Sequence, residues 1–297
     1  MCAFMEPAGD SQALRPPLWR TLLVLGRVSN LPTVWSNCLA GWLLGGGGSI
    51  QRLLELMAAA TCLYTAGMYL NDAFDAGFDQ EFRSERPIPR GDITNSMVWT
   101  IGLGLLALGV ALLLPLGTMA VALGATLAAN ILIYDAVHKQ VSYGPVIMAG
   151  CRFFLFLLAA EVADGANGFV LWWALALALY IIGLSYIARC ESKAGLIGYW
   201  PLVLMAAPLV VGWFAYAGPY RVKELILLAA LALWILRSVR FTFWMKPPQV
   251  GKTVSSLLAG IVIVDLLAVA GATPMVGAIF LTFFVLCLIF QRFIPAT

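Results

Sequence analysis

The sequence predicts an all-α protein: a polytopic bundle of nine to ten transmembrane helices. Hydrophobic residues make up 62% of the chain and charged residues only 11%, whereas soluble proteins carry about 25% charged residues. The apolar residues fall in successive runs, and a helix needs about 20 mostly apolar residues to cross a bilayer. Both observations place most of the chain inside a membrane.

The candidate spans are separated by short glycine- and proline-containing breaks such as Gly45–Gly48, Pro115–Gly117 and Gly218-Pro219, which are typical of loops. The predicted spans are 22–44, 52–72, 95–115, 117–137, 145–162, 169–189, 197–217, 223–243, 253–270 and 274–293. Residues 1–18 are polar and carry prolines, so we expect a loose N-terminal segment followed by one transmembrane domain over 19–297.

The basic residues predict the orientation of the bundle. If the N-terminus lies in the cytoplasm, all but three of the 18 Lys and Arg residues fall on or near the cytoplasmic side; the exceptions are Arg52, Arg221 and Lys223. Cytoplasmic loops of membrane proteins carry an excess of Lys and Arg. We therefore expect a multi-pass protein of the plasma (inner) membrane, with its N-terminus and polar loops in the cytoplasm.

Composition also limits the chemistry. The chain contains one histidine, His138, which excludes a histidine-based metal site. Its six cysteines are scattered without a Cys-x-x-Cys pair, so no disulfide or zinc framework is predicted. Residues 1–20 lack the apolar core of a signal peptide, and no nucleic-acid-binding signature is present.

One polar stretch stands at the end of the second span. Asp72, Asp75 and Asp79 are spaced i, i+3, i+7, which places them on one face of a continuous helix, with Asn71 beside them. Stacked carboxylates repel one another, so a cation is a natural partner. Mg²⁺ suits such oxygen ligands, and it typically binds through one or two carboxylates and substrate phosphates.

A basic run follows the aspartates, with Arg83, Arg86 and Arg90. Guanidinium groups bind phosphate oxygens in a bidentate manner. Acidic residues for a metal beside basic residues for phosphate indicate a Mg²⁺–diphosphate site. The alternative is a solvated helix end followed by ordinary cytoplasmic arginines.

Other polar residues near helix ends are candidates for the same site. Arg27 and Asn30 either point at a shared cavity or shape the start of the first span, and Lys139 either meets phosphate or extends its charged end to the membrane surface. Arg152 is expected to pair with a carboxylate, for which Asp135 is a candidate. Asp265 is expected to make a helix-packing hydrogen bond.

The aspartate stretch and its basic tail resemble the first motif of the UbiA superfamily of intramembrane prenyltransferases. The matching residues are Asn71-Asp72-x-x-Asp75-x-x-x-Asp79, followed by Arg83-x-x-Arg86-Pro87-Ile88. The resemblance extends over nearly the whole chain and includes Asn30-Leu31-Pro32-Thr33 and the segment from Tyr134 to Lys139. The motifs Trp35-Ser36-Asn37 and Ala149-Gly150-Cys151-Arg152 are similar to the branch of UbiA-like EboC proteins.

The resemblance implies helices around a central cavity, in which Mg²⁺ joins two aspartate-rich loops to a prenyl diphosphate donor, and a small hydrophobic or aromatic acceptor attacks the prenyl carbon. Asp72, Asp75 and Asp79 would hold the metal, and Asp72, Asp75, Tyr134 and Glu191 would be the catalytic residues. Substrate would be bound by Asn30, Asn71, Arg83, Arg86, Lys139 and Arg189.

The sequence departs from the family at the second acidic loop, where the family usually has two acidic residues four apart. Here Glu191 is the only acidic residue, and Arg189 and Lys193 flank it. We therefore expect one tightly bound Mg²⁺ rather than two, with basic side chains replacing the second ion. The alternatives are a non-catalytic lipid- or metabolite-binding or export component on the same fold, and a transporter that uses the aspartates as cation sites.

Overall fold

The computed structural model describes residues 16–163, 165–189, 198–215 and 220–296, and these residues form only helices, turns and loops. The prediction of an all-α bundle is confirmed. The helices are α1 (Leu18–Leu25), η1 (Val28–Asn30), α2 (Leu31–Leu44), α3 (Ile50–Phe74), α4 (Ala76–Phe82), α5 (Asn95–Ala111), η2 (Leu114–Leu116), α6 (Thr118–Val137), α7 (Gly144–Val162), α8 (Gly168–Arg189), α9 (Trp200–Met205), α10 (Ala207–Ala215), α11 (Arg221–Phe243), α12 (Val250–Ala268) and α13 (Pro274–Phe290).

Seven helices of the described part are long and apolar enough to cross a membrane alone: α3, α5 extended through η2, α6, α7, α8, α11 and α12. Two further apolar stretches, Trp200–Ala215 and Pro274–Phe290, are shorter. The first predicted span, 22–44, is divided between α1 and α2, so it is not one continuous helix. The division lies at Arg27, whose backbone is left-handed (φ 41°, ψ 47°), and just before Pro32, which cannot donate a helical hydrogen bond.

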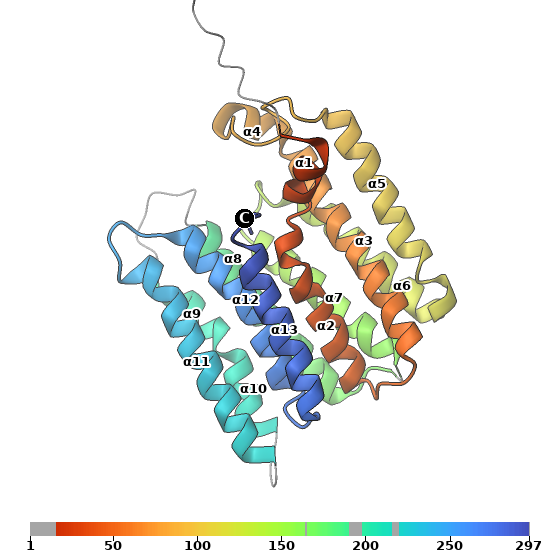
Figure 1. Cartoon of the computed structure of the whole chain (residues 1–297), viewed down its shortest axis with the longest axis vertical. Helices are drawn as coiled ribbons and strands as arrows, with labels where there is room; N and C mark the ends of the chain where they lie inside the picture. The colour runs from red at the N-terminus through yellow and green to blue at the C-terminus, as the bar shows by residue number, and fades with distance from the viewer. Residues whose placement is uncertain (1–15, 164, 190–197, 216–219, 297) are drawn as a thin grey trace, which may run out of the picture.

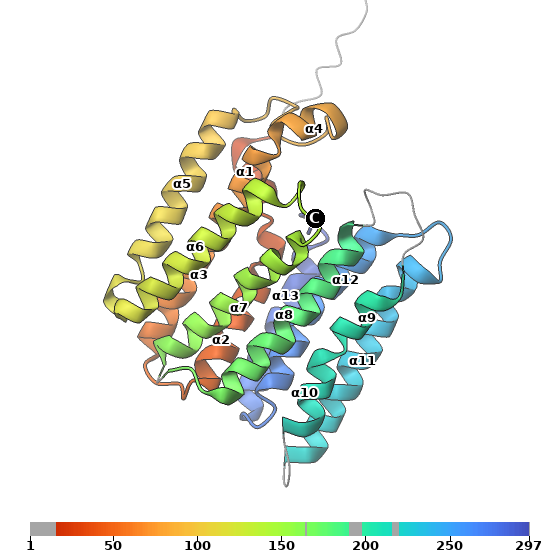
Figure 2. The same cartoon turned by 180° about the vertical axis from the view of Figure 1, so that it is seen from behind.

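The helices form one bundle with the polar loops of interest at one end (Figures 1 and 2). In its middle, α7 packs against α2, α6 and α8, and α12 packs against α2, α8, α11 and α13. On one flank α3 packs extensively against α5; on the other, α8 packs against α9 and α10, and α11 packs against α10. The short helix α4 lies across the end of the bundle where α3 finishes, and the C-terminus returns to this same end (Figure 1).

Two glycines let α2 approach the backbone of α7. A Cβ atom at Gly41 would lie 2.6 Å from the carbonyl oxygen of Phe156, and one at Gly45 would lie 2.5 Å from that of Ala160. These separations are too short for a side chain, so only glycine permits this contact. Small residues four apart are a common means of close helix packing in membranes.

We expect Gly41→Ala to destabilise the protein by about 2 kcal/mol, because the added methyl group forces apart two packed helices. The matched control is Gly104→Ala on α5, where an added Cβ meets nothing within 4 Å and alanine improves helix propensity. Thermal melting followed by size-exclusion chromatography in detergent measures both. Equal melting temperatures for the two variants would contradict the close α2–α7 contact.

The close contact between α2 and α7 encloses a polar network. Arg152 of α7 donates hydrogen bonds to the hydroxyl of Thr33 (2.9 Å) and to Asn37 Oδ1 (2.7 Å). Asn37 Nδ2 and the Ser36 hydroxyl in turn donate to one carboxylate oxygen of Asp265 on α12, at 2.7 and 2.5 Å. The helix-packing hydrogen bond predicted for Asp265 is confirmed. Arg152 does not bond to Asp135 but to Thr33 and Asn37, and Asn37 connects it to the carboxylate of Asp265.

Candidate active site

The aspartate stretch lies at a junction between two helices rather than on one continuous helix. α3 ends at Phe74 and α4 begins at Ala76, so Asp75 stands between them. The backbone hydrogen bonds run on through the junction, from Asp75 N–H to Asn71 O (3.0 Å) and from Asp79 N–H to Asp75 O (2.8 Å). Asp72, Asp75 and Asp79 are all buried. The helix α4 lies across the end of the bundle (Figure 1), and Asp79 stays close enough to Asp75 and Asp72 for their negative charges to add to the effect of burial in raising its pKa.

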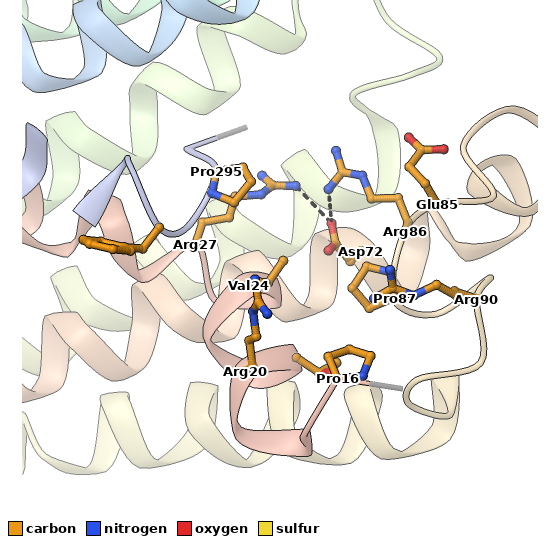
Figure 3. Close-up of a pocket in the computed structure, with 12 residues that line it drawn as sticks. Pro16, Arg20, Val24, Arg27, Asp72, Glu85, Arg86, Pro87, Arg90 and Pro295 are labelled. Atoms are coloured by element: carbon orange, nitrogen blue, oxygen red, sulfur yellow. Dashed lines mark hydrogen bonds and ion pairs between the residues drawn. The ribbon is translucent and has the colours of Figure 1, made fainter. Parts of the chain in front are cut away.

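Asp72 is the meeting point of two arginines. Its Oδ1 accepts from Arg27 Nη2 at 3.0 Å and lies 3.6 Å from Arg86 Nη1. Figure 3 shows the two guanidinium groups side by side, both directed at the same end of the Asp72 side chain. Arg27 comes from the turn before η1 and Arg86 from the loop after α4, so the carboxylate joins two segments far apart in the sequence. A diphosphate placed beside Asp72 would meet both guanidinium groups.

Asp75 is paired with the loop that follows α6. Lys139 Nζ lies 2.8 Å from Asp75 Oδ1 and His138 Nε2 lies 3.6 Å from Oδ2. Burial alone would raise the pKa of Asp75, but hydrogen bonds and charge from His138 and Lys139 outweigh it and hold the pKa below its usual value. The ring of Tyr134 stacks on His138, with 4.8 Å between ring centroids. Tyr134 is therefore adjacent to the Asp75 cluster.

Asn71 connects α3 with α6. Its Nδ2 donates to Asp135 Oδ1 at 3.1 Å, and both residues are buried. The other carboxylate oxygen of Asp135 is buried and has no hydrogen-bond partner among the residues that the structure describes. Asp135 therefore supports Asn71.

A hollow with a cavity volume of about 590 Å³ opens beside Asp72. Four arginines and two carboxylates line it, so its charged lining carries a net excess of two positive charges. The rest of the lining is largely apolar and includes Val24, Phe293 and Pro295. The charged lining residues are Arg20, Arg27, Arg86, Arg90, Asp72 and Glu85. A cation-rich hollow with an apolar wall suits an anionic headgroup joined to an apolar chain.

The other predicted site residues occupy different surroundings. Arg189 donates to the carbonyl oxygens of His138, Val141 and Ser142, at 2.6 to 2.8 Å. It therefore holds the loop that carries Lys139. Arg83 is half-buried and does not line the hollow. Glu191 and Lys193 lie outside the described residues.

Asn30 does not face the hollow as a free donor. Its Nδ2 donates to the carbonyl oxygen of Ala296 at 2.9 Å, and both residues are buried. Direct contact between Asn30 and substrate stays a prediction. In the structure Asn30 fastens the C-terminal residues.

The oxygen donors fit a metal ion that arrives with a diphosphate. Within the described ranges, no group of three or more Asp, Glu, His or Cys side chains lies close enough to hold a metal. Asp79 Oδ1, however, is buried and has no hydrogen-bond partner in the described part of the chain. Burial raises the pKa of Asp79, with Arg86 opposing this effect. Mg²⁺ commonly binds one or two carboxylates and takes its remaining ligands from phosphates and water, which matches this donor set.

Asp79→Asn is expected to raise the melting temperature of the metal-free protein. A buried oxygen without a partner costs about 1–3 kcal/mol, and more when charged, so removing the charge relieves the fold. The same change should reduce the stabilisation that Mg²⁺ with pyrophosphate gives the wild-type protein. Melting curves in EDTA and in Mg²⁺–pyrophosphate measure both effects. A variant that melts lower than wild type in EDTA would contradict this account of Asp79.

The structure places two further residues in the site. Of the two roles that the sequence allows for Arg27, facing a cavity or shaping the start of the first span, the structure shows it against Asp72. His138, which is not among the predicted site residues, lies against Asp75. The spacing of Tyr134 and His138, four residues apart at a helix end, was the available signal, since such residues share a face. Nothing in the sequence indicated Phe293 or Pro295.

Known proteins resemble this chain over part of its length. It is 27% identical over 177 residues to the digeranylgeranylglyceryl phosphate synthase of Methanoregula boonei, covering 59% of this chain and 60% of that protein. It is 29% identical over 129 residues to the 4-hydroxybenzoate octaprenyltransferase of Pectobacterium carotovorum, covering 42% and 45%. The matches thus span less than two thirds of these relatives.

The fold also has a solved counterpart. The apo structure of a UbiA homologue from Aeropyrum pernix matches 84% of this chain and 98% of its own, with a TM-score of 0.65 and 18% sequence identity. At this identity the likeness concerns the fold alone. The sequence pattern of the UbiA prenyltransferase family matches residues 30–196, which include the aspartate stretch and its partners on α6. Since this match covers more than half of the chain, the protein belongs to the UbiA prenyltransferase family.

Proposed function

We propose that this protein transfers a prenyl group from a prenyl diphosphate to a membrane-associated acceptor, in a reaction that depends on Mg²⁺. The observation that carries the proposal is the hollow at Asp72, where Arg27 and Arg86 converge on one carboxylate at the end of a membrane helix. Of the named relatives, one is a 4-hydroxybenzoate octaprenyltransferase and the other a digeranylgeranylglyceryl phosphate synthase, and the first name states prenyl transfer. Their acceptors differ, so we propose only a small hydrophobic or aromatic molecule for this chain.

The charged residues suit the donor's diphosphate. Arg27 and Arg86 would bind its oxygens, and Lys139 would approach from the Asp75 side. Mg²⁺, held by Asp72, Asp79 and the diphosphate, would supply positive charge to the leaving group. During transfer the bond between the prenyl C1 and the diphosphate oxygen breaks, and its electron pair leaves with the diphosphate. Fixed cations stabilise such developing charge without reorganising.

The surroundings of the reacting carbon would be apolar and aromatic. Tyr134 lies beside His138 and Asp75, from where its ring would face a carbon with carbocation character, as aromatic rings attract cations. The nucleophilic atom of the acceptor forms a bond to C1 and loses its proton. The prenyl chain would lie among the membrane helices, in contact with the bilayer.

The site would lie on the cytoplasmic side of the inner membrane. The excess of Lys and Arg at that end of the bundle supports this orientation, because cytoplasmic loops are enriched in these residues. The assignment to the EboC-like branch rests on the motifs quoted above and stays a prediction.

A second candidate function is a non-catalytic protein that binds or exports a prenyl diphosphate or related lipid. One observation favours it: Asp72 and Asp75 are already neutralised by the protein's own cations. In that case the site would bind a diphosphate without cleaving it.

The experiment uses radiolabelled geranylgeranyl diphosphate and the purified protein in lipid nanodiscs, with a membrane lipid extract as the source of acceptors. Prenyl transfer predicts a new labelled lipid product that disappears in EDTA. Labelled donor that is bound but recovered unchanged would favour the binding or export function.

A further inference from the structure

The chain beyond α13 returns to the site and forms part of it. After α13 ends at Phe290, a turn is closed by hydrogen bonds from Phe293 N–H and Ile294 N–H to Phe290 O, at 3.0 and 2.9 Å. Gln291 fixes the start of this turn to α12, by donating to Ser255 O at 3.0 Å. Residues 293–296, which we call the C-terminal strap, then run beside η1.

The strap is fastened to η1 by buried groups. Asn30 Nδ2 donates to Ala296 O at 2.9 Å, and the hydroxyl of Ser29 lies 3.5 Å from Pro295 O. Ser29, Asn30 and Ala296 are all buried, with Ser29 fully so. Both side chains that hold the strap therefore come from the three-residue turn that follows Arg27.

Arg27 has an unusual backbone. It is the only non-glycine residue with positive φ among the described residues, and an L-residue adopts this left-handed conformation only when its surroundings hold it there. The carbonyl oxygen of Arg27 is held by Asn30 N–H at 3.0 Å and by the Tyr64 hydroxyl at 3.2 Å. Its position at Asp72 thus depends on the packing of η1.

We propose that the C-terminal strap clamps η1 and thereby positions Arg27 for binding the diphosphate of the substrate. This inference rests on the proposed function and gives the strap a role as a positioning element. Phe293 and Pro295 also line the hollow, and Pro295 lies beside Arg27 (Figure 3), so the strap forms part of the wall next to this arginine. Pro295 and Ala296 line, on their other side, a second hollow with the basic residues Arg237, Lys252 and Arg292. The strap thus separates the candidate site from a second cationic surface.

Pyrophosphate binding in a double-mutant design tests the role of the strap. Ala296→Trp is designed to displace the strap, because Ala296 is only 5% exposed and an indole ring is far larger than the methyl group that it replaces. We expect a dissociation constant for Mg²⁺–pyrophosphate that is about tenfold higher, the usual effect of losing one hydrogen bond to a charged group. In the Arg27→Ala background, Ala296→Trp should have no further effect, because the strap acts through Arg27. Equal weakening in both backgrounds, or none in either, would overturn the proposal.

Controls separate positioning from general damage. Met275→Trp introduces the same side chain at a position of α13 that is 76% exposed, and it should bind pyrophosphate as wild type does. If Ala296→Trp does not fold, a variant lacking residues 293–297 replaces it, with the same expectations. Asn30→Ala combined with Ala296→Trp should bind no more weakly than the weaker single variant, since both remove one clamp. Additive losses would show that Asn30 acts independently of the strap and would contradict the clamp.

Cysteine labelling tests, without any substrate, whether the strap covers η1. A Ser29→Cys variant should take up no more of a water-soluble maleimide than its parent protein does, because Ser29 is fully buried under the strap. Adding Ala296→Trp should make this cysteine react. If it stays unreactive, the strap does not cover η1 and the proposal fails. If labelling behaves as expected but wild-type protein does not bind pyrophosphate, the proposed function fails instead, and with it the strap's role in binding substrate.

Discussion

Asp72→Asn is expected to lower the rate of diphosphate release by at least roughly a hundredfold, the usual effect of removing one preorganised charge-stabilising group. The carboxylate of Asp72 lies 3.0 Å from one guanidinium group and 3.6 Å from another. An amide carries no charge, so Arg27 and Arg86 would repel each other across it. The same change removes a proposed ligand of Mg²⁺.

The matched control is Glu55→Gln on the same helix. Glu55 lies near the opposite end of α3, where it accepts a hydrogen bond from Gln51 at 2.9 Å on the exposed surface. This change also converts a carboxylate to an amide, but far from the hollow, so the rate should stay as in wild type. Equal rates for Asp72→Asn and wild type would exclude Asp72 from the reaction.

The largest loss of stability is expected from Asp265→Ala. Asp265 is fully buried and is the carboxylate at the end of the network from Arg152 through Asn37. Removing one partner from a buried ionic network costs about 3–5 kcal/mol, because the remaining charge stays buried without compensation. Thermal melting in detergent, followed by size-exclusion chromatography, measures this loss.

A second variant identifies the cause of that loss. Replacing both ends of the network, with Asp265→Leu and Arg152→Met together, should recover much of the melting temperature, since apolar groups of similar volume often substitute for a buried ion pair. If the double variant is less stable than Asp265→Ala, the loss comes from packing rather than from the unpaired arginine.

The sequence predicts most of the fold, because the length and apolarity of a membrane helix are local properties. It fails where the chain changes direction without losing apolar character. The apolar sequence around Arg27 predicts one continuous span, but Arg27 adopts a left-handed backbone that separates α1 from α2. At Asp75 a regular spacing predicts one helix face, whereas the structure has a junction between α3 and α4.

The residue types of the candidate site are predictable, but their pairing is not. The acidic stretch, Arg86 and Lys139 are recognisable from spacing, and the structure brings Asp72 to Arg86 and Asp75 to Lys139. Arg152 was expected to meet Asp135, but the close contact of α7 with α2 places it at Asn37. This contact depends on which turn of one helix faces which turn of another, and no local pattern contains that information.

No local pattern in the sequence predicts the position of the C-terminal strap. The sequence shows an additional apolar helix after α12 but gives no reason for it. The hydrogen bond between Asn30 and Ala296 joins residues 266 positions apart, and it depends on α13 running back along α2 to the end of the bundle where the site lies. The added helix is thereby connected to the site.

The most direct test of the proposed function is pyrophosphate release from farnesyl and geranylgeranyl diphosphate by the purified protein in nanodiscs with a membrane lipid extract. We expect release in Mg²⁺ that stops in EDTA and is lost in Asp72→Asn but kept in Glu55→Gln. Release that continues in EDTA, or that is equal in Asp72→Asn, would contradict a metal-dependent reaction at this site. Bound donor without release would show that the hollow holds a diphosphate and does not cleave it.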